Sequence, residues 1–400
     1  MVDDSMDVEV PIHEQLKALQ RQLCQLKRRF GPAVADCVAA HNGFATTSGI
    51  PTSDHLEFQK ARRLCNPMEV LGEGRAGGMN RMFMNRSAIK LANINAMLGF
   101  PLVSRNNQSQ GHLHFVDLCG APGGFSEYIV HQCRASGIRV CRGFGMSLLG
   151  ANEHGNGARW KLSSARSEDN GFSLDYQVCK GSDGTGDIYQ WHNVEDLNRQ
   201  IHGAIGTNKV DLVLADGGFD AQRDFEEQEA LTQKIVVCQA AAAMSLLQPN
   251  GTLVLKMFGF QTSVIRAVMR HLFMAFDQLT IVKPISSRPA SAERYAVFVG
   301  FRGIPFGQAA LSWRNTVLLE DYGVCWSEQD KREFQRLYKY LDEVDLKMVN
   351  LNLKNCFAIL SALERKTLAV SNGQFDFDAE QHPRKHRVDI GAYKRQWRLQ

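Results

Sequence analysis

Between residues 114 and 301 the chain alternates short apolar runs with longer helical stretches, and this alternation restricts its fold more than any other feature. Helical patterns at 125–133 and 227–247 separate several of the runs. The runs that we predict to be strands are 114–118, 139–146, 210–215, 252–257, 279–283 and 295–301. Repeated strand–helix units of this kind form a mostly parallel sheet with helices on both faces. We therefore predict an α/β fold.

A glycine-rich turn at 120–124 follows the first predicted strand. Ligands of parallel sheets bind beyond the carboxyl ends of the strands, and glycines there let the backbone approach a ligand closely. The turn does not match G-x-G-x-x-G, which argues against a nicotinamide oxidoreductase. The longer string FVDLCGAPGGFS at 115–126 instead resembles the methionine-binding pocket of the RNA 2′-O-methyltransferases related to the bacterial heat-shock ribosomal methylase.

Four charged residues follow one another along the chain in the order Lys90, Asp216, Lys256 and Glu293. Lys90 lies on a predicted helix, and the other three lie near the ends of predicted strands. Each alone is explained as a solvated lysine or a helix-capping acid, but together they suit methylation of a ribose 2′-hydroxyl. That hydroxyl is a poor nucleophile and needs a positioned base, which a lysine can be only if its pKa is lowered. We hypothesise that Lys256 activates the hydroxyl and Asp216 orients it, while Lys90 and Glu293 position the ribose and Lys256.

A loop acid followed by an apolar residue, Asp187 and Ile188, offers a further candidate contact. The acid could accept a hydrogen bond from the amino group of adenine while the apolar side chain covers the ring. An aspartate turn on a surface loop explains the same residues equally well.

Further strings extend the resemblance over roughly residues 59–303. They are ARRLCNP at 61–67, MNRSAIKLAN at 84–93, GFGMSL at 143–148, ADGGF at 215–219 and KPISSRP at 283–289. With them the chain resembles the family of eukaryotic cap-specific nucleoside 2′-O-methyltransferases. The resemblance implies a Rossmann-like, S-adenosylmethionine-dependent methyltransferase sheet, mostly parallel with an antiparallel last strand. Flanking helices and helical N- and C-terminal extensions complete the expected architecture.

The resemblance also implies site residues. Methyl-donor contacts are implied at Asn85, Gly120, Ala121, Pro122, Gly123, Gly124, Phe125, Ser126, Asp187 and Ile188. Contacts with capped RNA are implied at Arg62, Glu226, Glu227, Gln228 and Ser291, beside the catalytic set Lys90, Asp216, Lys256 and Glu293. Three departures stand out: Gly120-Ala121 reverses the Ala-Gly of the animal enzymes, Ser291 replaces an asparagine, and residues before Leu56 match poorly.

The rest of the chain suggests how it is organised. We predict an amphipathic helix at 12–30 and two helical segments at 327–345 and 353–367. We divide it into an N-terminal helical extension (1–55), a methyltransferase domain (56–305), a helical appendage (306–370) and a polar basic tail expected to be flexible (371–400). Its ten cysteines show no CxxC or Cys/His spacing, so we predict neither a metal site nor a disulfide framework. The acidic start and the lack of a long apolar segment predict no secretory signal and no membrane span.

The net charge of +4 is compatible with RNA but does not require it. We expect S-adenosylmethionine as cofactor and the capped 5′ end of mRNA as partner, with the capping or transcription machinery as a candidate further partner. The expected location is the nucleus, or the cytoplasm for a viral protein. Two alternatives stay open: the same reaction on a later cap nucleotide or on ribosomal or transfer RNA, and an inactive RNA-binding scaffold.

Overall fold

The structure of the protein is a computed structural model that describes residues 11–28, 53–66, 68, 82–149, 160–161, 165–169, 171–218, 228–304, 309–318, 328–371 and 390–399. Its strands are β1 (His112–Leu118), β2 (Val140–Met146), β3 (Ala165–Asp169), β4 (Phe172–Cys179), β5 (Val210–Ala215), β6 (Leu247–Met257), β7 (Phe276–Val282) and β8 (Arg294–Phe301). Its helices are α1 (Ile12–Arg28), α3 (Ser53–Cys65), α4 (Arg86–Met97), α5 (Arg105–Gln110), α6 (Gly124–Ala135), α7 (Trp191–Ile205), α8 (Gln228–Leu246), α9 (Ser263–Ala275), α10 (Ala310–Leu318), α11 (Glu328–Ser371) and α12 (Ile390–Gln396).

The strands form one eight-stranded sheet in the order β3-β4-β2-β1-β5-β6-β8-β7. Neighbours from β4 to β6 run parallel, while the last strand, β8, is antiparallel to both β6 and β7. This confirms the predicted α/β sheet, mostly parallel with an antiparallel last strand. A second antiparallel strand, β3, pairs with β4 at the opposite edge and was not predicted.

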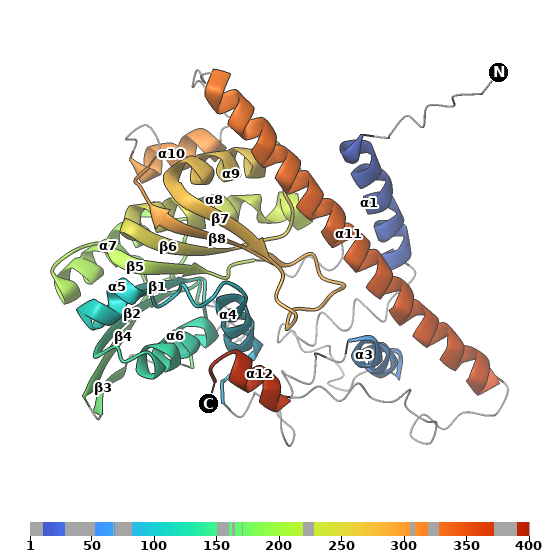
Figure 1. Cartoon of the computed structure of the whole chain (residues 1–400), viewed down its shortest axis with the longest axis horizontal. Coiled ribbons are helices and arrows are strands. Elements are labelled where there is room, and N and C mark those ends of the chain that lie inside the picture. The colour runs from blue at the N-terminus through green and yellow to red at the C-terminus, as the bar shows by residue number, and fades with distance from the viewer. Residues whose placement is uncertain are drawn as a thin grey trace.

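Helices cover both faces of the sheet (Figure 1). One face packs against α7, α8 and α9, and the other against α4 and α6. Strand β5 is buried along its whole length because it lies between these layers. Helix α8 is apolar on nearly every side, which fits its position between the sheet and α10.

The long helix α11 is a single element of 44 residues, although the sequence predicted two segments, 327–345 and 353–367. The interval contains Asn350 and Asn352, which have low helix propensity. On the same stretch Val349 and Leu353 are buried against α1. The burial of this apolar stripe outweighs the local propensity, so the helix continues.

Helix α1 confirms the amphipathic helix predicted from residue 12, and it packs on α11 through Leu16, Leu23 and Leu26. At the other end, residues 390–399 form α12 and a short extension that buries Trp397 and Leu399 against the α4 and α6 side. This part of the expected flexible tail is therefore packed, because its two large apolar side chains have a core to enter. The division at residues 55, 305 and 370 remains a prediction. In the described part of the chain no helix is long and apolar enough to span a bilayer.

Candidate active site

The turn between β1 and α6 is built around glycines that have no room for a side chain. A Cβ at Gly120 would lie 2.0 Å from Asp117 Oδ1, and a Cβ at Gly124 would lie 2.0 Å from Asn85 Oδ1. Gly123 has a φ of 108°, a left-handed conformation that side chains disfavour. The glycines thus allow β1, α6 and the start of α4 to approach one another at the carboxyl end of the sheet.

Asp117 lies beneath this turn and was not predicted as a site residue. Its Oδ2 accepts hydrogen bonds from the backbone N–H and the hydroxyl of Ser126, at 3.2 and 2.7 Å. Its Oδ1 is buried and has no hydrogen-bond partner among the described residues. Burial raises the pKa of Asp117 to about 7. A buried acceptor without a partner at a glycine turn suits a ligand that carries a positively charged donor.

Helix α4 positions one member of the predicted catalytic set. The Asn85 side chain caps the helix by accepting from the N–H groups of Ser87 and Ala88, at 3.0 and 3.4 Å. One and a half turns later, Lys90 Nζ lies 2.7 Å from Glu293 Oε1 and 2.9 Å from Oε2. The cap therefore fixes the helix that carries Lys90 beside the glycine turn.

The other three predicted catalytic residues meet where β5, β6 and β8 lie side by side. Lys256 Nζ lies 3.3 Å from Asp216 Oδ1, directly after β5. Tyr295 stands opposite Lys256 in the β6–β8 register, and its hydroxyl donates to Asp216 Oδ1 and Glu293 Oε1, both at 2.9 Å. Lys90, Glu293, Tyr295, Asp216 and Lys256 thus form one continuous polar chain. The sequence prediction omitted Tyr295, although its position two residues after Glu293 in the approach to a strand was a usable signal.

The polar chain from Lys90 to Lys256 contains charges of both signs. Burial alone would raise the pKa of Glu293, but Lys90, Lys256 and Lys283 outweigh it and hold that pKa well below its ordinary value. Burial, together with Asp216 and Glu293, raises the pKa of the Tyr295 hydroxyl well above its ordinary value, so it remains a donor. Lys90 therefore pairs with a Glu293 carboxylate that stays ionised at physiological pH.

The remaining predicted donor contacts lie near this edge of the sheet. Asp187 Oδ1 accepts from the N–H of Tyr189 at 2.9 Å, and a Cβ at Gly186 would meet Ser147 O, in the segment after β2, at 2.0 Å. Ile188 is buried, and the ring of Phe125 lies 6.0 Å from that of Tyr295. The structure therefore gathers these residues around the carboxyl ends of β1 and β2.

The predicted RNA contacts are more scattered. Arg62 lies half-buried on α3, whose Phe58 and Ala61 share an apolar cluster with Ala290, next to Ser291. Ser291 is half-buried, and its carbonyl accepts from Lys283 Nζ at 2.7 Å. Gln228 is buried at the start of α8, while Glu226 and Glu227 lie outside the described residues. Helix α3 and the 283–293 segment are thus adjacent, but Gln228 offers little surface to a ligand.

Two buried polar contacts hold residues that are adjacent in sequence to the candidate catalytic set, and neither was predicted. The Gln239 side chain accepts from the N–H of Gly217 at 2.9 Å and so holds the residue after Asp216. Arg294, between Glu293 and Tyr295, forms an ion pair with Asp345 of α11 and donates to Phe258 O at 2.9 Å. Gln239 was visible as a polar residue in an apolar helix, whereas the Arg294 pair depends on residues 51 positions apart.

Comparison with known proteins gives three findings. Residues 83–301 match the family described as FtsJ-like methyltransferase. The chain is 32% identical over 272 residues to cap-specific mRNA (nucleoside-2′-O-)-methyltransferase 1 of Drosophila melanogaster, covering 66% of this chain and 32% of that protein. It is 28% identical over 321 residues to the protein of the same name from Danio rerio, covering 77% of this chain and 36% of that protein.

The chain therefore spans about a third of the length of the curated relatives it matches. Among solved structures, human methyltransferase-like protein 13 in complex with SAH is similar over 60% of this chain and 94% of its own. That similarity has a TM-score of 0.31 at 12% identity, which is too low to support an argument.

Proposed function

The chain belongs to the FtsJ-like methyltransferase family, whose match covers more than half of it, and on this premise we propose that it methylates the ribose 2′-hydroxyl of the first transcribed nucleotide of capped mRNA. The observation that carries the proposal is the chain of contacts from Lys90 through Glu293, Tyr295 and Asp216 to Lys256. This arrangement places two lysines and two carboxylates around one point at the carboxyl end of the sheet.

The glycine turn, Asn85, Asp117 and the Asp187–Ile188 segment are the residues that would hold the methyl donor. When bound there, S-adenosylmethionine supplies an electrophilic methyl group on a sulfonium. The buried, unpartnered Oδ1 of Asp117 fits the amino group of the methionine portion. Because Gly120 and Gly124 lack side chains, Asp117 and Asn85 can lie directly against the turn where the donor would bind.

Lys256 would take the proton of the 2′-hydroxyl at Nζ as the new bond forms. An amine accepts a proton only when it is neutral. Burial and nearby positive charge favour the neutral form, whereas the carboxylate of Asp216 opposes it. The Lys256 side chain is only 15% exposed, and Lys90 acts on the same carboxylate, Glu293. Asp216 would orient the hydroxyl, and Lys90 with Glu293 would fix the ribose. Most of the rate would come from alignment of the reacting atoms.

The cap specificity rests on the relatives' printed activity and on Arg62, which lies on a helix adjoining the 283–293 segment. By the same reasoning we propose that the protein acts in the nucleus on new transcripts, with the capping or transcription machinery as a further partner. Methylation of a later cap nucleotide, or of ribosomal or transfer RNA, would use the same residues. Only the choice of RNA substrate distinguishes these reactions from the proposed one.

Short capped RNAs should gain one methyl group on the first transcribed nucleotide, and matched RNAs with a 5′-triphosphate should gain little. Mass spectrometry of nuclease digests locates the methylated nucleotide. Equal methylation of capped and triphosphate RNA would refute cap specificity while leaving ribose methylation intact. Methylation at the second nucleotide would refute only the assignment of the first.

Affinity for S-adenosylhomocysteine should rise as the pH increases toward 7 and then level off. The pKa of Asp117 is raised to about 7, so its carboxyl is protonated at lower pH, and only the carboxylate can pair with the amino group of the ligand. Below pH 7 the affinity should therefore fall by up to about tenfold per pH unit. Isothermal titration calorimetry measures this dependence over a titration window from about pH 5.5 to about pH 8.

In Asp117→Asn the affinity should be lower and this pH dependence should be lost. The exposed Asp277, which pairs with Arg302 on the β7 edge, provides the control, and Asp277→Asn should keep the normal profile. The same slope in Asp117→Asn would show that another group titrates.

A further inference from the structure

A polar cluster lies at the amino ends of the two central strands, β1 and β5, whereas the candidate active site lies at their carboxyl ends. His112 and His114 are the first and third residues of β1, and Asp211 is the second residue of β5. Each residue offers a ligand atom, and these atoms all lie within 4.8 Å of one another. We propose that His112, His114 and Asp211 bind one divalent transition-metal ion, with Zn²⁺ as the ion that these donors suit.

The strand geometry explains why the two histidines act together. Side chains two residues apart on a strand point to the same face, and the imidazole rings of His112 and His114 lie stacked with centroids 4.9 Å apart. β5 pairs with β1 in parallel, which brings Asp211 next to His114. Two ligands from one strand and a third from its neighbour thus need little rearrangement to enclose an ion.

Asp211 is held in place by groups that leave it able to bind a cation. Its Oδ2 accepts from the backbone N–H of His114 at 2.8 Å, and its Oδ1 accepts from the side chain of Gln248. Each carboxylate oxygen has a second lone pair free for a metal. Hydrogen bonds that orient a ligand in this way are a common feature of metal sites.

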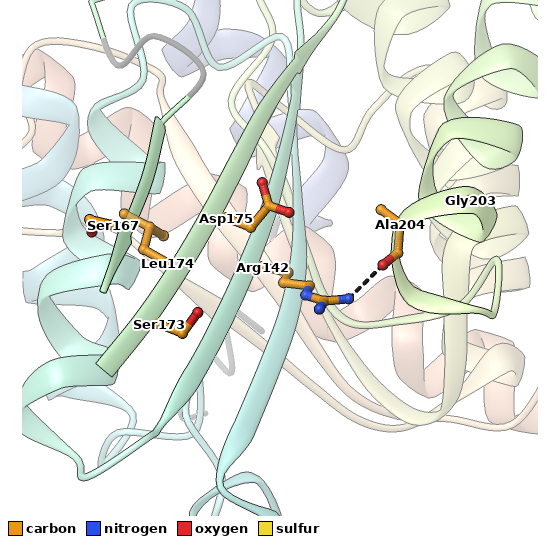
Figure 2. Close-up of a pocket in the computed structure, with 7 residues that line it drawn as sticks. All are labelled: Arg142, Ser167, Ser173, Leu174, Asp175, Gly203 and Ala204. Carbon is orange, nitrogen blue, oxygen red and sulfur yellow. Dashed lines mark hydrogen bonds between the residues drawn. The ribbon is translucent and has the colours of Figure 1, made fainter. Parts of the chain in front are cut away.

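The charges near the cluster favour neutral imidazole and limit the affinity. Burial and the neighbouring His112 and Arg142 lower the pKa of His114, although Asp211 acts in the opposite direction. Neutral imidazole is the form that binds metals. The positive charge of the Arg142 guanidinium would repel a bound cation and so limits the affinity. The guanidinium donates to Ala204 O at the end of α7 and lines a pocket together with Asp175 (Figure 2).

Two imidazoles and one carboxylate leave a fourth position for water, a set typical of Zn²⁺. At about 3.3 Å per residue, β1 separates the cluster from the glycine turn by roughly 20 Å. The ion would therefore join the amino ends of β1 and β5 without entering the methyl-transfer site. The prediction of no metal considered only cysteine and cysteine–histidine spacing along the chain, which cannot reveal ligands that meet on paired strands.

The test uses the full chain, stripped with a chelator and titrated with Zn²⁺ by calorimetry, and with Co²⁺ for its visible spectrum. We expect one equivalent bound, a Co²⁺ spectrum of nitrogen and oxygen ligands, and a melting temperature raised by about 3 °C or more at saturating Zn²⁺. His114→Gln and, separately, His112→Gln should weaken Zn²⁺ binding by at least about tenfold. His112 is half-exposed at the first position of its strand, so that variant should fold even if His114→Gln does not.

His192 provides the matched control because it is an exposed histidine beside a carboxylate, Asp183, outside the cluster. His192→Gln should bind Zn²⁺ as the unaltered chain does. The proposal is overturned if His112→Gln binds Zn²⁺ with unchanged affinity, if the unaltered chain binds none, or if the Co²⁺ spectrum shows a thiolate charge-transfer band. Methyl transfer should not depend on His112, so loss of Zn²⁺ binding with retained activity separates this site from the proposed function.

Discussion

Replacement of Lys256 by alanine should lower the rate constant for methyl transfer by about 10³-fold. The variant loses the amine that lies 3.3 Å from Asp216 Oδ1 at the meeting point of β5, β6 and β8. The affinity for S-adenosylhomocysteine should stay near normal, since the glycine turn and Asp117 are untouched. Single-turnover kinetics with a capped RNA, together with calorimetry of the bound ligand, separates these two effects.

Lys209 is a suitable control lysine because its Nζ is also half-buried and donates to a carbonyl, Ser245 O, at 2.8 Å. It precedes β5 and so lies at the amino end of the sheet. Lys209→Ala should retain full activity. Near-normal turnover by a Lys256→Ala protein that still binds the ligand would refute the assignment of Lys256 as the base.

Replacement of Asp345 by alanine should reduce the free energy of unfolding by about 3–5 kcal/mol, because it leaves the Arg294 guanidinium buried and without its counter-charge. Both side chains of the pair are only 3% exposed. Asp345 Oδ2 also accepts from the N–H of Phe260 at 3.1 Å and from the Gln261 side chain at 2.6 Å. Chemical denaturation measures the loss.

Asp342, one turn earlier on α11, allows a matched comparison. It pairs with Arg266, but the two side chains are 23% and 18% exposed, so Asp342→Ala should cost about 1 kcal/mol. Asp345→Ala should also lower activity, since Arg294 lies between Glu293 and Tyr295. Equal losses of stability in the two variants would show that the Arg294 pair has no special role.

The strands of the sheet centre were predictable because they are buried on both faces and read as continuous apolar runs. Strand β5, with the sequence VDLVLA, is an example. Strand β4 escaped prediction because its residues alternate between buried and half-exposed and several are polar. It lies near the edge of the sheet, where one face is less well covered. The predicted break in α11 failed for a different reason, because helix α1 supplies the apolar partner that local propensity ignores.

The residues of the candidate site also fall into those that the sequence indicated and those that it did not. Lys90, Asp216, Lys256 and Glu293 could be chosen as candidates because each stands in a recognisable local string, Lys90 on a helix and the other three at strand ends. Asp117 and Arg294 could not, because their significance depends on what surrounds them in space: a Cβ-free turn above Asp117, and Asp345 of a distant helix beside Arg294. Sequence patterns identify groups that perform chemistry more readily than the buried contacts that hold them.

The partnership of α1 with α11 has a consequence for synthesis of the chain. Leu16, Leu23 and Leu26 bury themselves against Val349, Leu353, Cys356 and Leu360, more than three hundred positions later. At about 5–20 residues per second, a ribosome makes the sheet before it makes the helix that covers α1. The apolar residues of α1 that contact α11 therefore remain exposed to solvent, chaperones and other nascent chains until α11 has been made. Helix α1 is therefore expected to reach its final packing only after α11 has been made, although α1 itself is made much earlier.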